Sequence, residues 1–178
     1  MPSSRRTGPA ARAAQIIRQA GYLSLATSTP EAGPWAAQLQ YAWFTSPLKL
    51  VVGSHVTARH SRDIAATARA AATLSTMPDS PHGLDGLQIS GDCQALSSEA
   101  AAVTAPMFYE QMFPEAVDAQ QHALPLAQLH GDGPQRLFEL RIRELWILDL
   151  ERWEREGIST RLAVDIPAVE TALDETNQ

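Results

Sequence analysis

The stretch that decides the fold runs from Leu25 to Ile64 and reads LATSTPEAGPWAAQLQYAWFTSPLKLVVGSHVTARHSRDI. It contains two short turns, at Gly33-Pro34 and at Ser46-Pro47, with apolar-rich segments of strand length around them. Such segments, bounded by turn residues, are typical of strands. Strands joined by so few residues pair antiparallel, because a parallel pair needs a long crossover. The stretch therefore predicts an antiparallel sheet that is followed by a helix.

The rest of the chain extends this pattern into one domain over residues 1–178, with an N-terminal helix in residues 1–20 and a C-terminal tail over 166–178. Six strands are predicted, over residues 22–27, 35–44, 48–53, 70–76, 87–96 and 136–150. Helices are predicted over residues 5–20, 54–69 with Thr57 as the cap, 97–112, and at the start of the tail. Residues 78–86 are predicted to be a loop, and 114–134 a helical and loop segment. The fold class is mainly β (α+β), a small six-stranded antiparallel barrel with flanking helices.

Composition excludes several function classes. The net charge of -6 argues against a general polyanion binder, since nucleic acids are held by clustered Lys and Arg. No apolar run approaches the roughly 18 residues of a membrane span, and no secretory signal is recognisable at the N-terminus. The single cysteine, Cys93, can form no internal disulfide and is predicted to be a buried apolar side chain. We expect a cytoplasmic protein without a metal site, because the histidines lack metal-binding spacing.

The ordered set of segments resembles the pyridoxamine 5'-phosphate oxidase-like superfamily of FMN-binding split β-barrels. The resemblance is carried by Leu25-Ala26-Thr27, by the aromatic strand Trp35 to Phe44, and by a third strand that ends at Ser54. A basic pair at the start of the next helix, Arg59-His60, completes it. It implies a split barrel that binds FMN and works as a homodimer with the flavin at the subunit interface. The strand Trp35 to Phe44 and a Met/Phe patch at residues 107–113 are candidate dimer contacts.

Ser54, Thr57, Arg59 and His60 are the candidate phosphate-binding residues. The phosphate of FMN is dianionic near neutral pH, and a helix N-terminus with an adjacent Arg offers free amide donors and a bidentate cation. The resemblance places Arg59 and His60 at the two basic phosphate positions. His60 stands where Lys is more usual in the family, and a histidine there would make phosphate binding weaker or pH-dependent. The alternative is a solvated helix face on which Arg59 pairs with a nearby acid.

Gln38 and Gln40 share one face of the second strand, and Gln88 lies on the fifth. In the resembled family the second strand runs beside the flavin ring, so these amides are candidate ring contacts. An ordinary solvent-facing strand side is the alternative.

Three functions remain open at the level of sequence. The first is a flavin-dependent oxidoreductase, in which FMN or a deazaflavin carries the redox chemistry and the substrate is an unidentified small molecule. The second is a non-enzymatic flavin-binding or sensor protein. The third is a haem-binding relative, for which His55 or His60 would be the axial ligand.

Overall fold

The computed structural model describes residues 8–76 and 85–175 of the 178-residue chain. The predicted loop over residues 78–86 falls mostly outside them. The strands are β1 (Tyr22–Thr29), β2 (Gly33–Gln40), β3 (Ala42–Phe44), β4 (Lys49–His55), β5 (Arg69–Thr76), β6 (Asp85–Ala95), β7 (Gln135–Leu148) and β8 (Arg161–Ala163). The helices are α1 (Pro9–Gln19), α2 (Arg59–Thr67), α3 (Ser98–Met112), α4 (Ala116–His122), α5 (Leu150–Glu156) and α6 (Ile166–Asp174), with a short 3-10 turn, η1, at Leu126–Gln128.

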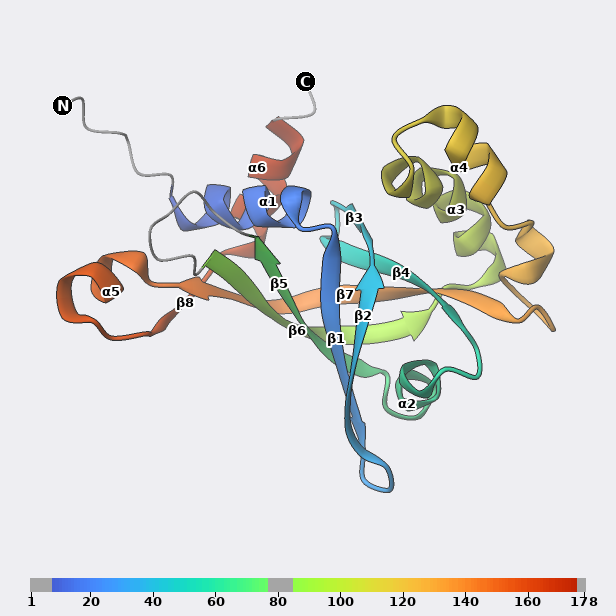
Figure 1. Ribbon diagram of the computed structural model, residues 1–178, viewed down its shortest axis with the longest axis horizontal. Helices are drawn as coiled ribbons and strands as arrows, with labels where there is room; N and C mark the ends of the chain where they lie inside the picture. The colour runs from blue at the N-terminus through green and yellow to red at the C-terminus, as the bar shows by residue number, and fades with distance from the viewer. Residues whose placement is uncertain (1–7, 77–84, 176–178) are drawn as a thin grey trace.

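A single antiparallel sheet, in the order β2-β1-β5-β6-β7-β4-β3, forms the body of the protein, and β8 pairs with β7. Its two edges are consecutive in the sequence, because only Tyr41 separates β2 from β3. Before Tyr41 the strand pairs with β1, and after it the strand pairs with β4. This change of partner curls the sheet into a barrel and leaves β2 and the second half of β4 unpaired on one side. Figure 1 shows the long β1–β2 hairpin that results.

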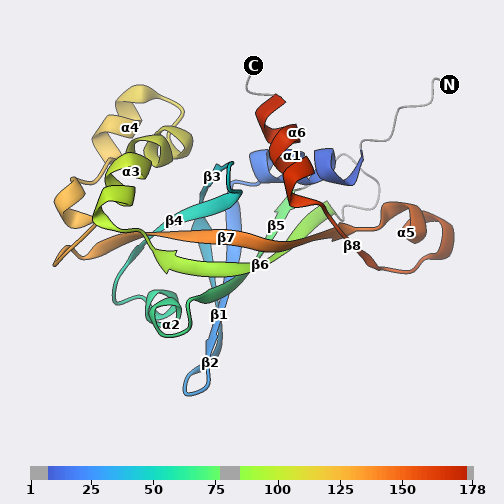
Figure 2. The same cartoon turned by 180° about the vertical axis from the view of Figure 1, so that it is seen from behind.

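The barrel interior is filled by the inward residues of the strands, while helices close it from outside. Side chains such as Leu23, Leu50, Leu74 and Ile147 are fully buried in it. Helices α1 and α6 pack on each other over one end, and α2 lies near the other (Figures 1 and 2). None of the described helices is long and apolar enough to cross a membrane.

A second apolar cluster joins α3 to the outer face of the barrel. Phe108 and Tyr109 pack there with Val51 of β4, Leu137 of β7 and Leu129. Phe108 and Tyr109 of the Met/Phe patch thus pack within the chain, and the role of the patch as a dimer contact stays a prediction. Figure 2 shows α3 and α4 at one end of the sheet and α5 at the other.

The antiparallel barrel predicted from the sequence is confirmed, but the number of six strands is wrong for the described residues. The predicted strand 35–44 is two strands, because the chain changes partner at Tyr41. The short strand β8 follows α5, and both were missed because neither has an alternating or a long amphipathic pattern. The strand predicted to reach residue 150 ends at Leu148, where Asp149 caps α5 by accepting a hydrogen bond from the backbone N–H of Arg152.

Cys93 is buried in the barrel, as predicted. Burial raises the pKa of this thiol to about 12, and the nearby Glu139 carboxylate contributes a smaller part of the rise. The side chain is therefore a small apolar group and not a thiolate nucleophile near neutral pH.

Gly91 is required where β6 and β7 come unusually close. The register of the pair shifts between Ser90 and Gly91, and a Cβ on Gly91 would lie 2.0 Å from the carbonyl oxygen of Arg141. We predict that Gly91→Ala lowers the free energy of unfolding by roughly 1–3 kcal/mol, the usual cost of overpacking. Urea denaturation measures this directly. Gly21→Ala is the matched control, because nothing lies within 4 Å of its new Cβ. Equal losses in both variants would contradict the prediction.

Candidate functional site

A cavity of about 520 Å³ opens where β2 separates from β4 and α3 covers the gap. Its walls come from six elements, β1, β2, β4, α3, α4 and β7, and from the segments that follow the two helices. The lining residues are Tyr22, Gln38, Leu39, Gln40, Gly53, Phe108, Tyr109, Met112, Phe113, His122, Leu124 and Gln135. Among these residues there is no Asp, Glu, Lys or Arg. The cavity therefore has aromatic and amide walls, which suit a large planar molecule with several hydrogen-bonding groups.

Gln38 and Gln40 reach this cavity because of the strand register. They lie opposite Ser24 and Tyr22 on β1, so their side chains share the outer face of the barrel. Both are exposed. The structure therefore brings the two predicted amides together at one cavity.

Gln88 does not line that cavity. It lies in the middle of the sheet, opposite Thr73 of β5 and Trp146 of β7. Its exposed side chain is on the same outer face as Gln38, with β1 and β5 between them. A role for Gln88 toward a ligand stays a prediction.

His60 and Ser54 are bonded to each other at the first turn of α2. The His60 Nε2 and the Ser54 Oγ are 2.6 Å apart, and the His60 side chain is buried. Burial lowers the pKa of His60, and the Asp63 carboxylate, which acts in the opposite direction, is the smaller influence. His60 is therefore neutral near pH 7, and it contributes a hydrogen bond and no charge.

Arg59 lies against the β1–β2 hairpin. Its Nη2 donates to the carbonyl oxygens of Gly33, at 2.9 Å, and of Ala32. Its guanidinium lies 5.0 Å from the centre of the Trp35 ring, and its Nε is 3.7 Å from an oxygen of Asp63. Arg59 thus pairs with a nearby acid, as the alternative prediction had it, but its side chain lies on the hairpin and not on a solvated helix face. It is not directed at an open phosphate site.

Thr57 does not cap α2, which corrects the sequence prediction. The Thr57 hydroxyl lies 2.8 Å from the Nδ1 of His55, and the helix starts two residues later, at Arg59. The cap position is Ala58, which has no side-chain oxygen to accept a hydrogen bond from the first turn. The N–H groups of that turn therefore lack the side-chain acceptor that usually serves them.

Asp63 anchors the underside of α2. Its carboxylate is buried and accepts a hydrogen bond of 2.8 Å from the Thr27 hydroxyl on β1. The nearby Ser61 Oγ is buried and makes no hydrogen bond among the described residues. The first turn of α2 therefore holds an unsatisfied donor beside its free N–H groups.

Sequence reasoning missed the wall that α3 and α4 contribute to the cavity. The apolar side chains of this wall follow the spacing of one helix face, namely Phe108, Tyr109, Met112 and Phe113. Such spacing indicates that the face is packed, but it does not indicate that a cavity lies beside it. His122 stacks on Phe113, with ring centres 4.8 Å apart, and lies on a segment whose structure had no clear sequence pattern. No three His, Cys, Asp or Glu side chains of residues 8–76 and 85–175 lie close enough together to hold a metal ion.

Comparisons with protein-family models and with curated proteins gave no match. Solved structures do match. A haem-binding protein of Mycobacterium smegmatis matches 94% of this chain with a TM-score of 0.64 at 18% identity, and this chain spans 62% of that protein. A pyridoxamine 5'-phosphate oxidase-related, FMN-binding protein of Nostoc punctiforme matches 93% of this chain and 100% of its own, with a TM-score of 0.58 at 14% identity.

The chain has the pyridoxamine 5'-phosphate oxidase-like split-barrel fold. A FAD-binding protein of Mesorhizobium loti has it too, with a TM-score of 0.56 at 12% identity over 74% of this chain and 87% of its own. Split barrels thus bind FMN, FAD or haem, and identities this low establish the fold alone.

The buried neutral His60 makes stability depend on pH. Because its pKa is lower in the folded chain than in the unfolded one, the unfolded chain takes up the proton first as the pH falls. The stabilising contribution is complete above about pH 6.5, the ordinary value for His, and is lost below it. We predict that His60→Gln flattens the decline of the urea midpoint between about pH 7.5 and pH 5. The same decline in both proteins would show that His60 does not cause it.

Proposed function

We propose that this split barrel binds FMN, with the flavin ring in the cavity between β2, β4 and α3 and the phosphate at the first turn of α2. One observation carries the proposal. Gln38 and Gln40 line the same cavity as Gly53, and the next residue, Ser54, is bonded to His60 of that first turn. A volume of about 520 Å³ lies within the range of cofactor pockets.

The first turn of α2 suits a dianionic phosphate. Its uncapped N–H groups and the helix dipole favour an anion, and the unsatisfied Ser61 hydroxyl is a further donor. In the proposed bound state the Arg59 guanidinium turns from the carbonyls of the hairpin toward the phosphate. A charge-assisted pair then replaces hydrogen bonds to neutral carbonyls. His60 and Ser54 remain a neutral pair at the edge of the site.

The ring end needs planar walls and amide partners. Gln38, Gln40 and Gln135 offer both donors and acceptors to the ring edge, and Phe108 and Phe113 exclude water from one side. When bound, FMN supplies hydride or electron transfer, and the protein orients it. We propose that the protein is an oxidoreductase in which no side chain serves as the redox group. Its Cys93 thiol is buried inside the barrel.

Haem is a second candidate, favoured by His122. This histidine lines the cavity together with Met112, and both side chains are of types that ligate haem iron. His55 and His60, the histidines considered from sequence, are bonded to Thr57 and Ser54 instead. The absorbance spectrum of purified protein after incubation with each cofactor separates the two functions, because flavin and haem have distinct bands.

The phosphate site is tested by removing one charge at a time from α2. We predict that Arg59→Ala weakens FMN binding by about 1.5–3 kcal/mol, the scale of a charge-assisted hydrogen bond, and that Arg59→Lys restores part of it. Arg62→Ala is the matched control, because Arg62 is exposed on the same helix and carries the same charge. Fluorescence titration measures each affinity.

Riboflavin, which lacks the phosphate, separates a phosphate contact from damage to the fold. It should bind wild type and Arg59→Ala equally. The wild type should take up about one FMN per chain. If Arg59→Ala and Arg62→Ala then weaken FMN binding equally, a specific phosphate contact of Arg59 is ruled out. No uptake of FMN at all would overturn the proposed function.

We also propose that two chains pair through the outer face of β1, β2 and β5, with the flavin at their interface. Small side chains cover this face, including the exposed Ala26, Ala36 and Thr73. Tyr22, which lies on the same face opposite Gln40, is 52% exposed. A flat face of small residues with an exposed aromatic ring at its edge suits a two-fold contact.

Light scattering coupled to gel filtration tests the pairing. We predict a mass of twice the 19.3 kDa of one chain at micromolar concentration. Ala26→Arg should reduce that mass toward one chain, because it places a charge in the centre of the contact. A wild-type protein that elutes as a single chain would refute the dimer.

A further inference from the structure

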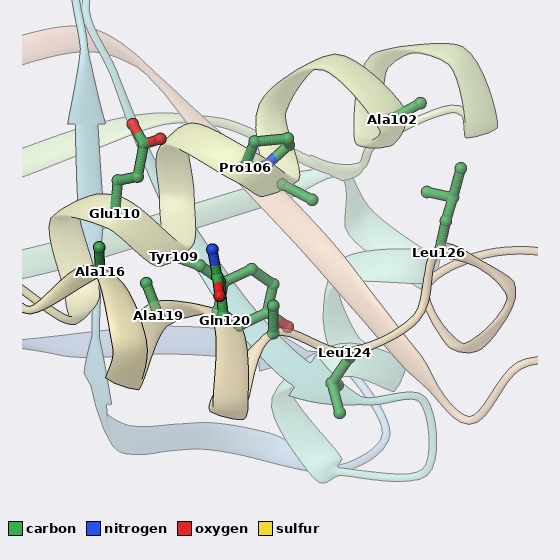
Figure 3. Close-up of a pocket in the computed structure, with 11 residues that line it drawn as sticks. Ala102, Pro106, Tyr109, Glu110, Ala116, Ala119, Gln120, Leu124 and Leu126 are labelled. Atoms are coloured by element: carbon green, nitrogen blue, oxygen red, sulfur yellow. The ribbon is translucent and has the colours of Figure 1, made fainter.

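A second cavity, of about 380 Å³, lies between α3 and α4 and is distinct from the proposed flavin site. Figure 3 shows the two helices side by side, with the ring of Tyr109 and the side chain of Gln120 in the space between them. The lining residues are Ala102, Ala105, Pro106, Tyr109, Glu110, Ala116, Ala119, Gln120, Ala123, Leu124 and Leu126. The volume is that of a small organic molecule.

The cavity exists because both helices present alanine where a packed helix pair would present leucine. Ala105 and Ala119 are each 8% exposed, so the helices do meet, but their methyl groups do not fill the space between them. Water in an apolar space of this kind finds few hydrogen-bond partners. An apolar occupant would therefore displace poorly held water.

The polar groups of the cavity restrict what it can take. Its lining contains one charged residue, Glu110, which is exposed, and no Lys, Arg or His. An anion would therefore meet no cation there. The Tyr109 side chain is 9% exposed, and its hydroxyl makes no hydrogen bond with any described residue. It is available as a partner for a polar group on the occupant.

Tyr109 also connects this cavity to the proposed flavin site. Tyr109 and Leu124 line both cavities, so an occupant of one lies a single side chain away from an occupant of the other. The Tyr109 ring packs edge-on against Phe108 at 5.2 Å between ring centres and an angle of 82°. This packing fixes the shared wall.

We infer that the α3–α4 cavity binds an uncharged, mainly apolar small molecule that forms a hydrogen bond with Tyr109. The role of this cavity as the substrate site rests on the proposed function, because only a bound flavin would make the neighbouring cavity a reaction centre. Binding of the apolar molecule does not depend on flavin.

The neutral fluorescent probe N-phenyl-1-naphthylamine, which has one N–H group, tests the inference. We expect saturable binding by the wild type and at least a tenfold loss of affinity in Ala119→Phe and in Ala116→Phe, whose rings occupy the cavity. Ala116 is exposed at the start of α4, so this variant is expected to fold even if Ala119→Phe does not. Val117→Phe is the matched control, because Val117 is 73% exposed and does not line the cavity. Its affinity should equal that of the wild type.

FMN added in a separate titration distinguishes the two proposals. FMN uptake should be unchanged in Ala116→Phe, and FMN should quench the emission of the bound probe without raising its dissociation constant. Probe binding that no variant weakens, or that FMN displaces competitively, would place the probe elsewhere and overturn the inference. If the probe binds as expected but the protein takes up no FMN, the α3–α4 cavity is still a ligand site. Only the proposed flavin function is then rejected.

Discussion

The change of strand partner at Tyr41 is the constraint on which the rest of the structure depends. The Tyr41 side chain is buried, and its hydroxyl donates a 2.7 Å hydrogen bond to the carbonyl oxygen of Ile17 in α1. Burial raises the pKa of this phenol, which is therefore protonated and able to donate at all physiological pH values. The bond fixes the strand at the point where it leaves β1 and joins β4. Without that switch the two ends of the sheet would not lie next to each other around the gap between β2 and β4.

The same switch places polar residues from distant parts of the chain around one gap. Gln38 and Gln40 lie near the end of the part of the strand that pairs with β1, while Gly53 and Ser54 lie near the end of β4. Helix α2 follows directly, and Asp63 holds it to Thr27 of β1. The side chain of Arg59 links the helix to the hairpin carbonyls. The hairpin, the helix and the cavity are therefore connected through this side chain, and a ligand that attracts Arg59 would take it away from the hairpin carbonyls.

Helices α3 and α4 form a unit that is packed tightly on one side and loosely on the other. Its inner face is fixed to the barrel by Phe108 and Tyr109, which are buried against β4 and β7. Its own helix–helix contact is made by alanines, which leave space where larger side chains would fill it. One tightly packed face and one loosely packed face allow the unit to offer a cavity without loss of its attachment to the barrel.

The sequence by itself determined the antiparallel barrel, most of its strands and the polar side of the second strand. These depend on local patterns, because alternation and short turns fix which face of a strand is buried. Two features depended on contacts that no local pattern encodes. The side chain of Arg59 lies on a hairpin that is 26 residues away in the chain, and Thr57 pairs with His55 instead of capping the helix. Only the tertiary structure decided that Gln38 and Gln40 share a cavity with α3 while Gln88 does not, because sheet order and helix docking bring distant residues together.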